Sequence, residues 1–422
     1  MPATETPPTS NAPQHADMDQ FAIRNGELVV GGEPLSVLAA RVGQTPFYAY
    51  DRGLMRVRVA GLREALPAAV KLHYAMKANP LPAVVGFMAQ LVDGIDVASA
   101  GELKVALDAG ADPREVSFAG PGKREAELRQ AVASRVLVNL ESMREVLLLQ
   151  SISTDLGIRA RVAVRVNPDF ELKGSGMKMG GGPKQFGVDV EDVPQMLAEV
   201  EAAGLDFEGF HLFAGSQNLR AESICEAQLK SYELALRLAE RNPAAVRFLN
   251  LGGGFGIPYF PGEKRLELAP IAANLHVIVE RAARDLPAAS IVIELGRYLV
   301  GEAGVYVTRI VDRKVSRGKV FLVTDGGLNH HLSASGNFGQ VIRKNYPVTI
   351  GNRLGSAAAG GAREEASVVG PLCTPLDLLA DRMSLPVARQ GDLVVVFQSG
   401  AYGASASPQA FLGHASCTEV LV

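Results

Sequence analysis

A lysine closes an apolar run that has the character of a buried strand. The run covers residues 70–76, and Lys77 follows it within the stretch HYAMKANP. Burying an ammonium group is costly unless the group is paired or neutralised. The lysine is therefore either a side chain that extends to the rim of the protein or a functional group. The functional interpretation is an imine-forming lysine, whose amine must be partly desolvated to be neutral and nucleophilic.

Two later stretches could bind an anion. LGGGFGIPY contains Gly252, Gly253 and Gly254, and consecutive glycines let backbone N–H groups approach a phosphate closely. FAGSQ, which ends the preceding apolar run, adds Ser216. A plain tight turn is the alternative for the glycines, and a dinucleotide fingerprint is weak because Ile257 replaces its third glycine. Two such stretches after consecutive strands favour a phosphate site.

A carboxylate follows in IELGR, where Glu294 precedes Arg297 by three residues. A salt bridge between these two side chains is one interpretation, and a catalytic carboxylate is the other. A lysine, a phosphate site and a carboxylate together meet the needs of pyridoxal phosphate, whose pyridine nitrogen requires an acidic partner to stay protonated. We therefore expect Lys77 to hold the aldehyde of that cofactor as an imine.

Short apolar runs alternate with helical segments from residue 47 to about 305, and this pattern predicts a parallel sheet. A (β/α)8 barrel needs eight strands, so the first of nine runs, FYAY at 47–50, is expected to be a lead-in. A doubly wound sheet is the alternative, but repetition over about 250 residues favours the barrel. The runs are FYAY, VKLHYAM, GIDVAS, VSFAG, VLVNL, VAVRV, GFHLFAG, FLNLGGG and SIVIELG.

The pattern changes after this region. Residues 306–422 contain strands and turns without intervening helices, which predicts a β domain, so the barrel domain is expected to span 47–305. Residues 24–46 resemble a hairpin that pairs with this β domain. Residues 1–20 are polar and rich in proline and threonine, so they are expected to form a disordered tail.

Composition restricts the possible partners. The chain has 422 residues, is 47% hydrophobic and has a net charge of -3, so neither nucleic acid nor an anionic membrane is indicated as a partner. No apolar stretch is long enough to span a membrane. The three cysteines are widely spaced, which argues against a disulfide framework or a metal cluster. We expect a cytoplasmic protein without a metal site.

The motifs jointly resemble the fold-type III pyridoxal-phosphate decarboxylases, the family of diaminopimelate and ornithine decarboxylases. They occur in the order YAMKAN, DVASAGEL, VRVNP, HLFAGSQ, GGGFG, ELGR, GPLCTPLD and SGAYG. The resemblance implies a PLP-dependent carboxy-lyase with an alanine racemase-like (β/α)8 TIM barrel and a C-terminal β domain. It also implies a head-to-tail homodimer with active sites at the interface.

The resemblance also implies roles for individual residues. Lys77 carries the cofactor, Glu294 pairs with the pyridine nitrogen, and Cys373 of the partner subunit protonates the substrate carbon after carbon dioxide leaves. A small buried thiol is the alternative for Cys373. The remaining residues implied around the cofactor are Asp96, Arg165, Phe213, Ser216, Gly252, Gly253, Gly254, Leu295, Gly296, Arg297 and Tyr402.

The chain departs from the family pattern at two positions. Phe213 stands where the family usually stacks a histidine on the cofactor ring. Thr374 follows Cys373, where the family usually has an acid that binds the distal ammonium of the substrate, and a hydroxyl cannot compensate a buried ammonium as a carboxylate does. Asp377 is a candidate to supply the missing carboxylate.

A third departure follows the motif TDGG. An arginine-containing stretch that holds the distal carboxylate in diaminopimelate decarboxylases is absent, and LNHHLSASGNFGQ replaces it. His330 and His331 are therefore candidates to line a substrate channel. An exposed pair at a strand end is the alternative.

These departures resemble a subgroup that decarboxylates L-glutamate loaded on an acyl carrier protein in butirosin synthesis. Similar proteins occur beside exopolysaccharide export systems. The shared stretches are MKMGGGPKQFG, DGGLNHH, GPLCTP and SGAYGASASPQAFLGH. The resemblance implies a carrier-bound aminoacyl substrate and an acyl carrier protein as partner. Two alternatives remain: a diaminopimelate decarboxylase acting on the free amino acid, and a non-catalytic PLP-binding protein.

Overall fold

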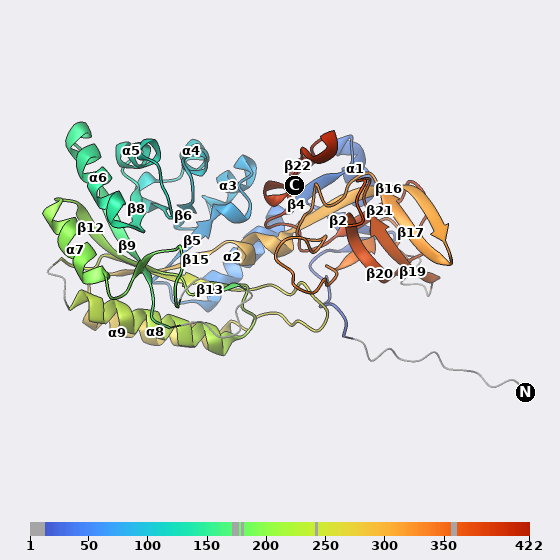
Figure 1. Ribbon diagram of the computed structural model, residues 1–422. Helices are drawn as coiled ribbons and strands as arrows, with labels where there is room; N and C mark the ends of the chain where they lie inside the picture. Colours follow the sequence, from blue (N-terminus) through green and yellow to red (C-terminus); the bar gives the residue numbers. More distant parts are fainter. Residues whose placement is uncertain (1–12, 171–176, 179–180, 241–243, 356–360) are drawn as a thin grey trace, which may run out of the picture.

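The computed structural model describes residues 13–170, 177–178, 181–240, 244–355 and 361–422, and its two parts lie side by side (Figure 1). The part on the left of Figure 1 is a parallel barrel surrounded by helices, and the part on the right consists mainly of strands. The predicted barrel and β domain are both confirmed, and the doubly wound alternative is wrong because the sheet closes on itself.

Eight parallel strands form the barrel: each pairs with the next one along the chain, and the last, β15, pairs with the first, β5, which closes it. All eight correspond to apolar runs of the sequence. They are β5 (Val70–Ala75), β6 (Gly94–Val97), β7 (Val116–Phe118), β8 (Leu137–Leu140), β9 (Arg161–Asn167), β12 (Asp206–Leu212), β14 (Phe248–Gly253) and β15 (Ser290–Leu295).

Helices cover the outside of the barrel (Figure 1) because each presents an apolar face to the strands. In the longest one, Ile224, Tyr232 and Ala235 are buried against the barrel. The helices are α2 (Arg52–Ala65), α3 (Pro82–Met88), α4 (Ala100–Asp108), α5 (Glu125–Ala133), α6 (Met143–Leu156), α7 (Val193–Ala202), α8 (Ala221–Ala239), α9 (Ala269–Asp285) and α10 (Arg297–Val300).

The second part is built around a long strand, β16 (Gly304–Ser316), which pairs with β4 (Phe47–Tyr50), β17 (Lys319–Thr324) and β21 (Leu393–Val396). The FYAY run at 47–50 is thus a strand of this sheet, not a lead-in to the barrel. All four of its residues are buried, which requires a sheet covered on both faces. The other strands are β18 (Val348–Ile350), β19 (Arg363–Val369), β20 (Leu378–Pro386) and β22 (Thr418–Leu421).

The N-terminal segment packs against this sheet without joining its strand ladder. Its strands β1 (Ile23–Arg24), β2 (Glu27–Val30) and β3 (Glu33–Pro34) form a small sheet of their own, followed by α1 (Leu35–Val42). Apolar residues of β2 and α1 share one buried cluster with residues of β4, β16 and β21. Residues 1–12 of the expected tail lie outside the described residues, and the exact domain boundaries stay predictions.

Two searches of the described ranges bear on possible partners. None of the helices there combines the length and apolarity that crossing a membrane requires. In the same ranges, no group of three or more histidine, cysteine, aspartate or glutamate side chains is arranged to hold a metal ion.

Candidate active site

Lys77 lies immediately after β5, on the short 3-10 turn Met76–Ala78 at the carboxyl end of the barrel. Its amine is 3.6 Å from Oε1 of Glu294 and 5.7 Å from the centre of the Phe213 ring. The side chain is 45% exposed, so the amine opens into a pocket. Burial lowers the pKa of Lys77, but the charges of Glu294, Tyr402 and Asp96 together outweigh this, and the net pKa is raised.

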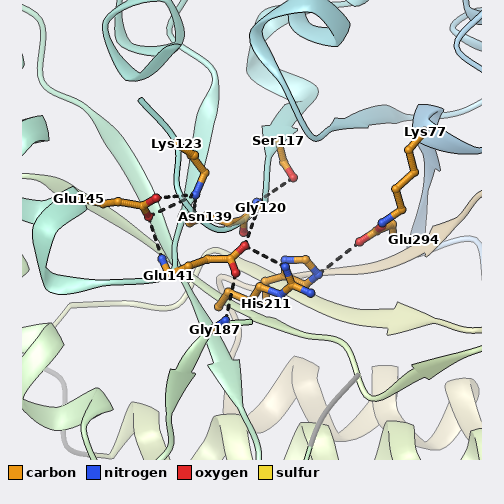
Figure 2. A network of polar contacts seen from close by, with 11 residues as sticks. Lys77, Ser117, Gly120, Lys123, Asn139, Glu141, Glu145, Gly187, His211 and Glu294 are labelled. Atoms are coloured by element: carbon orange, nitrogen blue, oxygen red, sulfur yellow. Dashed lines mark hydrogen bonds and ion pairs between the residues drawn. The ribbon is translucent and has the colours of Figure 1, made fainter. Parts of the chain in front are cut away.

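Glu294, near the end of β15, lies between two basic side chains. Its Oε2 is 3.2 Å from Nε2 of His211 on β12, and its Oε1 faces Lys77 (Figure 2). Burial raises the pKa of Glu294, but the charge of Lys77, the contact with His211 and the charge of Arg165 lower it far below its ordinary value. The carboxylate is therefore ionised. The contact with His211 was not predicted from the sequence.

A small pocket surrounds the amine of Lys77, and residues from both parts of the chain line it. The backbone N–H of Tyr402, from the β domain, donates to the Ala78 carbonyl at 2.7 Å. The Asn79 amide donates to the Gly400 carbonyl at 3.0 Å, so the loop that carries Tyr402 is fastened to the lysine turn. The lining residues are Ala75, Lys77, Phe213, Ser216, Gly254, Phe255, Glu294, Leu295, Gly296, Arg297 and Tyr402.

The consecutive glycines form a backbone wall, of which Gly254 lines the pocket, whereas Gly252 and Gly253 are not among the lining residues. Gly252 and Gly254 have φ angles of +69° and +75°, which side chains other than glycine rarely tolerate. A Cβ on Gly253 would overlap the carbonyl oxygen of Glu294. The backbone of Asn218 donates to the Gly254 carbonyl at 2.9 Å, so the loops after β12 and β14 lie side by side. Only glycine fits this close approach.

Arg297 completes this side of the pocket. Its Nη1 donates to the Tyr259 hydroxyl at 2.9 Å, and its guanidinium lies 4.7 Å from the centre of the Tyr402 ring. The alternative of a salt bridge between Arg297 and Glu294 is wrong, because Glu294 is bound by Lys77 and His211. Nε of Arg297 is buried without a partner among the described residues. This unpaired donor, the glycine wall and Ser216 fit a phosphate group.

Asp96 and Arg165 lie outside the residues that line the pocket. Asp96, on β6, accepts a hydrogen bond from Ser117 at 2.7 Å and lies 3.1 Å from Nδ1 of His73. Arg165, on β9, donates to Glu141 at 2.8 Å. Their charges still act on the site, because Asp96 favours the charged form of Lys77 and Arg165 favours the charged form of Glu294.

Asp377 does not face the pocket of its own chain. Its buried carboxylate accepts hydrogen bonds from the backbone of Leu328 at 2.6 Å and of Leu372 at 2.8 Å. Its two oxygens therefore hold two loops together, and a role of Asp377 in substrate binding stays a prediction. Burial raises the pKa of Asp377, and these backbone bonds oppose the increase.

His330 and His331 are both buried within the β domain, so the interpretations as a substrate channel and as an exposed pair are both wrong. Nε2 of His331 lies 2.9 Å from the Ser399 hydroxyl, and burial lowers the pKa of His331 to about 3. Nε2 of His330 lies 2.8 Å from the carbonyl oxygen of Ala415. The rings of Tyr48, Tyr306 and Tyr346 pack around His331.

Cys373 and Thr374 lie in the loop between β19 and β20. Cys373 is exposed, so the alternative of a small buried thiol is wrong. Thr374 is half-buried, and its hydroxyl accepts a hydrogen bond from the backbone of Leu376 at 3.3 Å. Neither residue is among those that line the pocket around Lys77 in the same chain.

Comparison with known sequences places this geometry in a family. Residues 52–301 match the pyridoxal binding domain of the pyridoxal-dependent decarboxylases. The L-glutamyl-[BtrI acyl-carrier protein] decarboxylase of Niallia circulans is 38% identical over 384 residues, covering 90% of this chain and 89% of the relative. The diaminopimelate decarboxylase of Aquifex aeolicus is 34% identical over 386 residues, covering 90% and 87%.

Solved structures agree with the sequence relatives. AQ1208 from Aquifex aeolicus superposes with a TM-score of 0.81 at 31% identity, covering 95% of this chain and 92% of that one. Diaminopimelate decarboxylase from Helicobacter pylori, complexed with L-lysine, superposes with a TM-score of 0.79 at 27% identity, covering 92% and 94%. The chain therefore belongs to the pyridoxal-dependent decarboxylase family, and it is an enzyme, a carboxy-lyase with pyridoxal 5'-phosphate as its cofactor.

Proposed function

We propose that this enzyme removes carbon dioxide from an aminoacyl group without a distal ammonium, preferably an L-glutamyl group on an acyl carrier protein. The observation that carries the proposal is the loop after Cys373. Thr374 offers a neutral hydroxyl, and Asp377, the one carboxylate among residues 370–377, is occupied by two backbone amides. Losing a charge-assisted hydrogen bond to a buried ammonium costs roughly 1.5–3 kcal/mol. The name of the Niallia circulans relative agrees with such a substrate.

The pocket residues would hold the cofactor in a defined orientation. Lys77 would bind its aldehyde carbon, and the ionised Glu294 would face the pyridine nitrogen and keep a proton there. Ser216, the glycine wall and Arg297 would bind the phosphate, with Tyr402 beside it. The chemistry that bound pyridoxal phosphate supplies is an electron sink for the pair left when the bond from the α-carbon to the carboxylate breaks. Phe213 would cover one ring face without donating a proton.

Proton delivery would need a second copy of the chain. Cys373 is exposed and does not line the pocket of its own chain. In the proposed homodimer, the thiol of Cys373 reaches the partner's pocket and gives its proton to the α-carbon after carbon dioxide has left. The resulting thiolate regains a proton from water before the next turnover.

A screen of carbon dioxide release tests the proposed substrate. The substrates are free meso-diaminopimelate, ornithine, lysine and glutamate, together with glutamyl-loaded carrier protein. We expect efficient release from the carrier-bound substrate and poor release from the three diamino acids. Decarboxylation of free diaminopimelate is the second candidate, and the Aquifex aeolicus relative favours it. Efficient turnover of that free amino acid would replace the first proposal with the second.

A further inference from the structure

A buried network of charged side chains lies near the pocket, and the proposed chemistry gives it no role. Its members are Lys123, Glu141, Glu145 and Arg165. Figure 2 shows Glu141 between the pair Lys123 and Glu145 on one side and His211 and Glu294 on the other. Glu141 follows β8 directly, at the end of the barrel where the pocket lies, and it is buried.

The carboxylate of Glu141 links the ends of several neighbouring strands. Its Oε1 accepts hydrogen bonds from the backbone of Gly120 at 2.6 Å and from Nη1 of Arg165 at 2.8 Å. Its Oε2 accepts a hydrogen bond from the backbone of Gly187 at 3.0 Å. Gly120 follows β7, Arg165 belongs to β9, and Gly187 precedes β11 (Val188–Asp189). One side chain therefore holds three separate segments.

The contacts of Glu141 with Arg165 and Gly187 fix the backbone just before β11, the short strand that pairs with β9. The Arg165 guanidinium lies 5.0 Å from the centre of the Phe186 ring, next to Gly187. Gly187 has a φ of +74°, and a Cβ there would lie 2.9 Å from the carbonyl oxygen of Arg165. The same connection contributes β10 (Met177–Lys178), which pairs with β13 (Gly215–Ser216), and β13 contains a residue of the phosphate side. Glu141 therefore holds Gly187 in the same connection that contains β10, whose partner strand β13 includes the pocket residue Ser216.

The ion pair between Lys123 and Glu145 contacts the backbone of Glu141. The backbone N–H of Glu141 donates to Oε2 of Glu145 at 2.8 Å. Nζ of Lys123 lies 3.1 Å from Oε1 of Glu145 and donates to the Asn139 carbonyl at 2.7 Å. Lys123 and Glu145 are both buried, and together with Glu141 and Arg165 they form a group without net charge. An ion pair buried in this way is costly to break on one side.

We propose that Glu141 is a positioning residue of the active site: it holds the Arg165 guanidinium at the end of the barrel that carries the pocket and fixes the chain at Gly187. Arg165 in turn favours the ionised form of Glu294, which faces the pyridine nitrogen in the proposed orientation. The inference rests on that proposed orientation. Loss of the Glu141 charge would leave Arg165 without its carboxylate and weaken the hold on the backbone of Gly187.

The test compares Glu141→Gln with Glu208→Gln. Glu208 also bridges two arginines, Arg161 at 2.9 Å and Arg247 at 3.1 Å, but Arg161 lies at the opposite end of β9 from the pocket. The apoenzyme of each variant is titrated with pyridoxal phosphate, and amide hydrogen exchange is followed over residues 181–190. We expect Glu141→Gln to weaken cofactor binding by roughly ten- to a hundredfold, the range that corresponds to the loss of one charge-assisted hydrogen bond. Faster exchange at Gly187 should accompany it.

The control Glu208→Gln and a second variant, Glu141→Asp, separate a positioning role of Glu141 from a general loss of stability. Glu208→Gln should bind the cofactor like the wild type, even if its melting temperature falls. Glu141→Asp, which keeps the charge but shortens the side chain, should lose affinity as well, and it decides the matter if the glutamine variant does not fold. Wild-type affinity in a folded Glu141 variant, or an equal loss in Glu208→Gln, would overturn the inference. Lys77→Ala tests the proposed cofactor orientation separately.

Discussion

At the scale of single residues, a lysine within β5 and a lysine just after it provide a direct comparison. Lys71 lies in β5, where its amine is 2.7 Å from Glu115 at the opposite end of the barrel from the pocket. Lys77 follows the same strand and opens into the pocket. A lysine is therefore identified as functional by its position at the carboxyl end of the strand, and not by its residue type alone.

Lys77→Ala should abolish the visible absorbance of bound cofactor and the release of carbon dioxide, because no other amine lines the pocket among the residues that the structure describes. Lys71→Ala should retain both and lose at most about 1 kcal/mol of stability, as is usual for a partly exposed ion pair. Absorbance spectra of the purified variants and a carbon dioxide assay measure both effects. A coloured, active Lys77→Ala enzyme would show that the cofactor binds elsewhere.

Residue types at strand ends could be predicted from the sequence, whereas side-chain partners in loops could not. Lys77 and Glu294 each follow or end an apolar run, so their place in the barrel follows from strand order. The orientation of the Asp377 side chain depends on which backbone N–H groups lie near it in the folded chain. These groups belong to Leu328 and Leu372, which are not predictable from the sequence around Asp377. Glu141 was missed for the same reason, because its partners come from the residues after β7, from β9 and from the residue before β11.

At the scale of elements, the loop between β19 and β20 depends on Asp377. Asp377→Asn places an amide N–H where one of two backbone donors needs an acceptor, at a cost of about 1–3 kcal/mol. We expect a lower melting temperature and an equal fractional loss of kcat/KM for all substrates, because the loop carries Cys373 and Thr374. A loss confined to diaminopimelate would instead mean that Asp377 binds the distal ammonium.

The buried imidazole of His331 makes the β domain sensitive to acid. Burial lowers its pKa from 6.5 to about 3, so between these values the unfolded chain binds a proton that the folded chain does not. Stability therefore falls as pH falls below 6.5, by up to about 1.4 kcal/mol per pH unit from this group. Melting temperatures between pH 7 and 5 should fall less in His331→Asn than in the wild type. Parallel pH profiles would contradict this.

The run FYAY shows what element prediction from sequence leaves open. Its apolar character correctly indicated a buried strand, and its place before the other runs suggested a lead-in to the barrel. The structure pairs it with β16 and β22, which come more than 250 residues later in the chain. Periodicity gives the type of an element, but strand partners distant in sequence are determined by packing.

At the scale of the whole molecule, we expect an obligate homodimer with shared sites. Lys77→Ala and Cys373→Ala should each be nearly inactive, and mixing them should recover about a quarter of the wild-type activity, since half of the dimers are mixed and each then has one complete site. Lys77→Ala mixed with Glu294→Gln is the matched control and should recover nothing. Absence of recovery in the first mixture, with subunit exchange shown independently, would place Cys373 outside the partner's site.

The substrate preference of the assembled enzyme is the central claim, and the ratio of kcat/KM for glutamyl-carrier protein to kcat/KM for free meso-diaminopimelate tests it most directly. The ratio is measured for the wild type and for Thr374→Glu, which restores an acid beside Cys373. We predict a large ratio for the wild type. In Thr374→Glu it should fall by roughly one to two powers of ten through better turnover of diaminopimelate, with no gain on the carrier-bound substrate. A wild-type enzyme that turns over free diaminopimelate more efficiently than the carrier-bound glutamyl group would contradict the account.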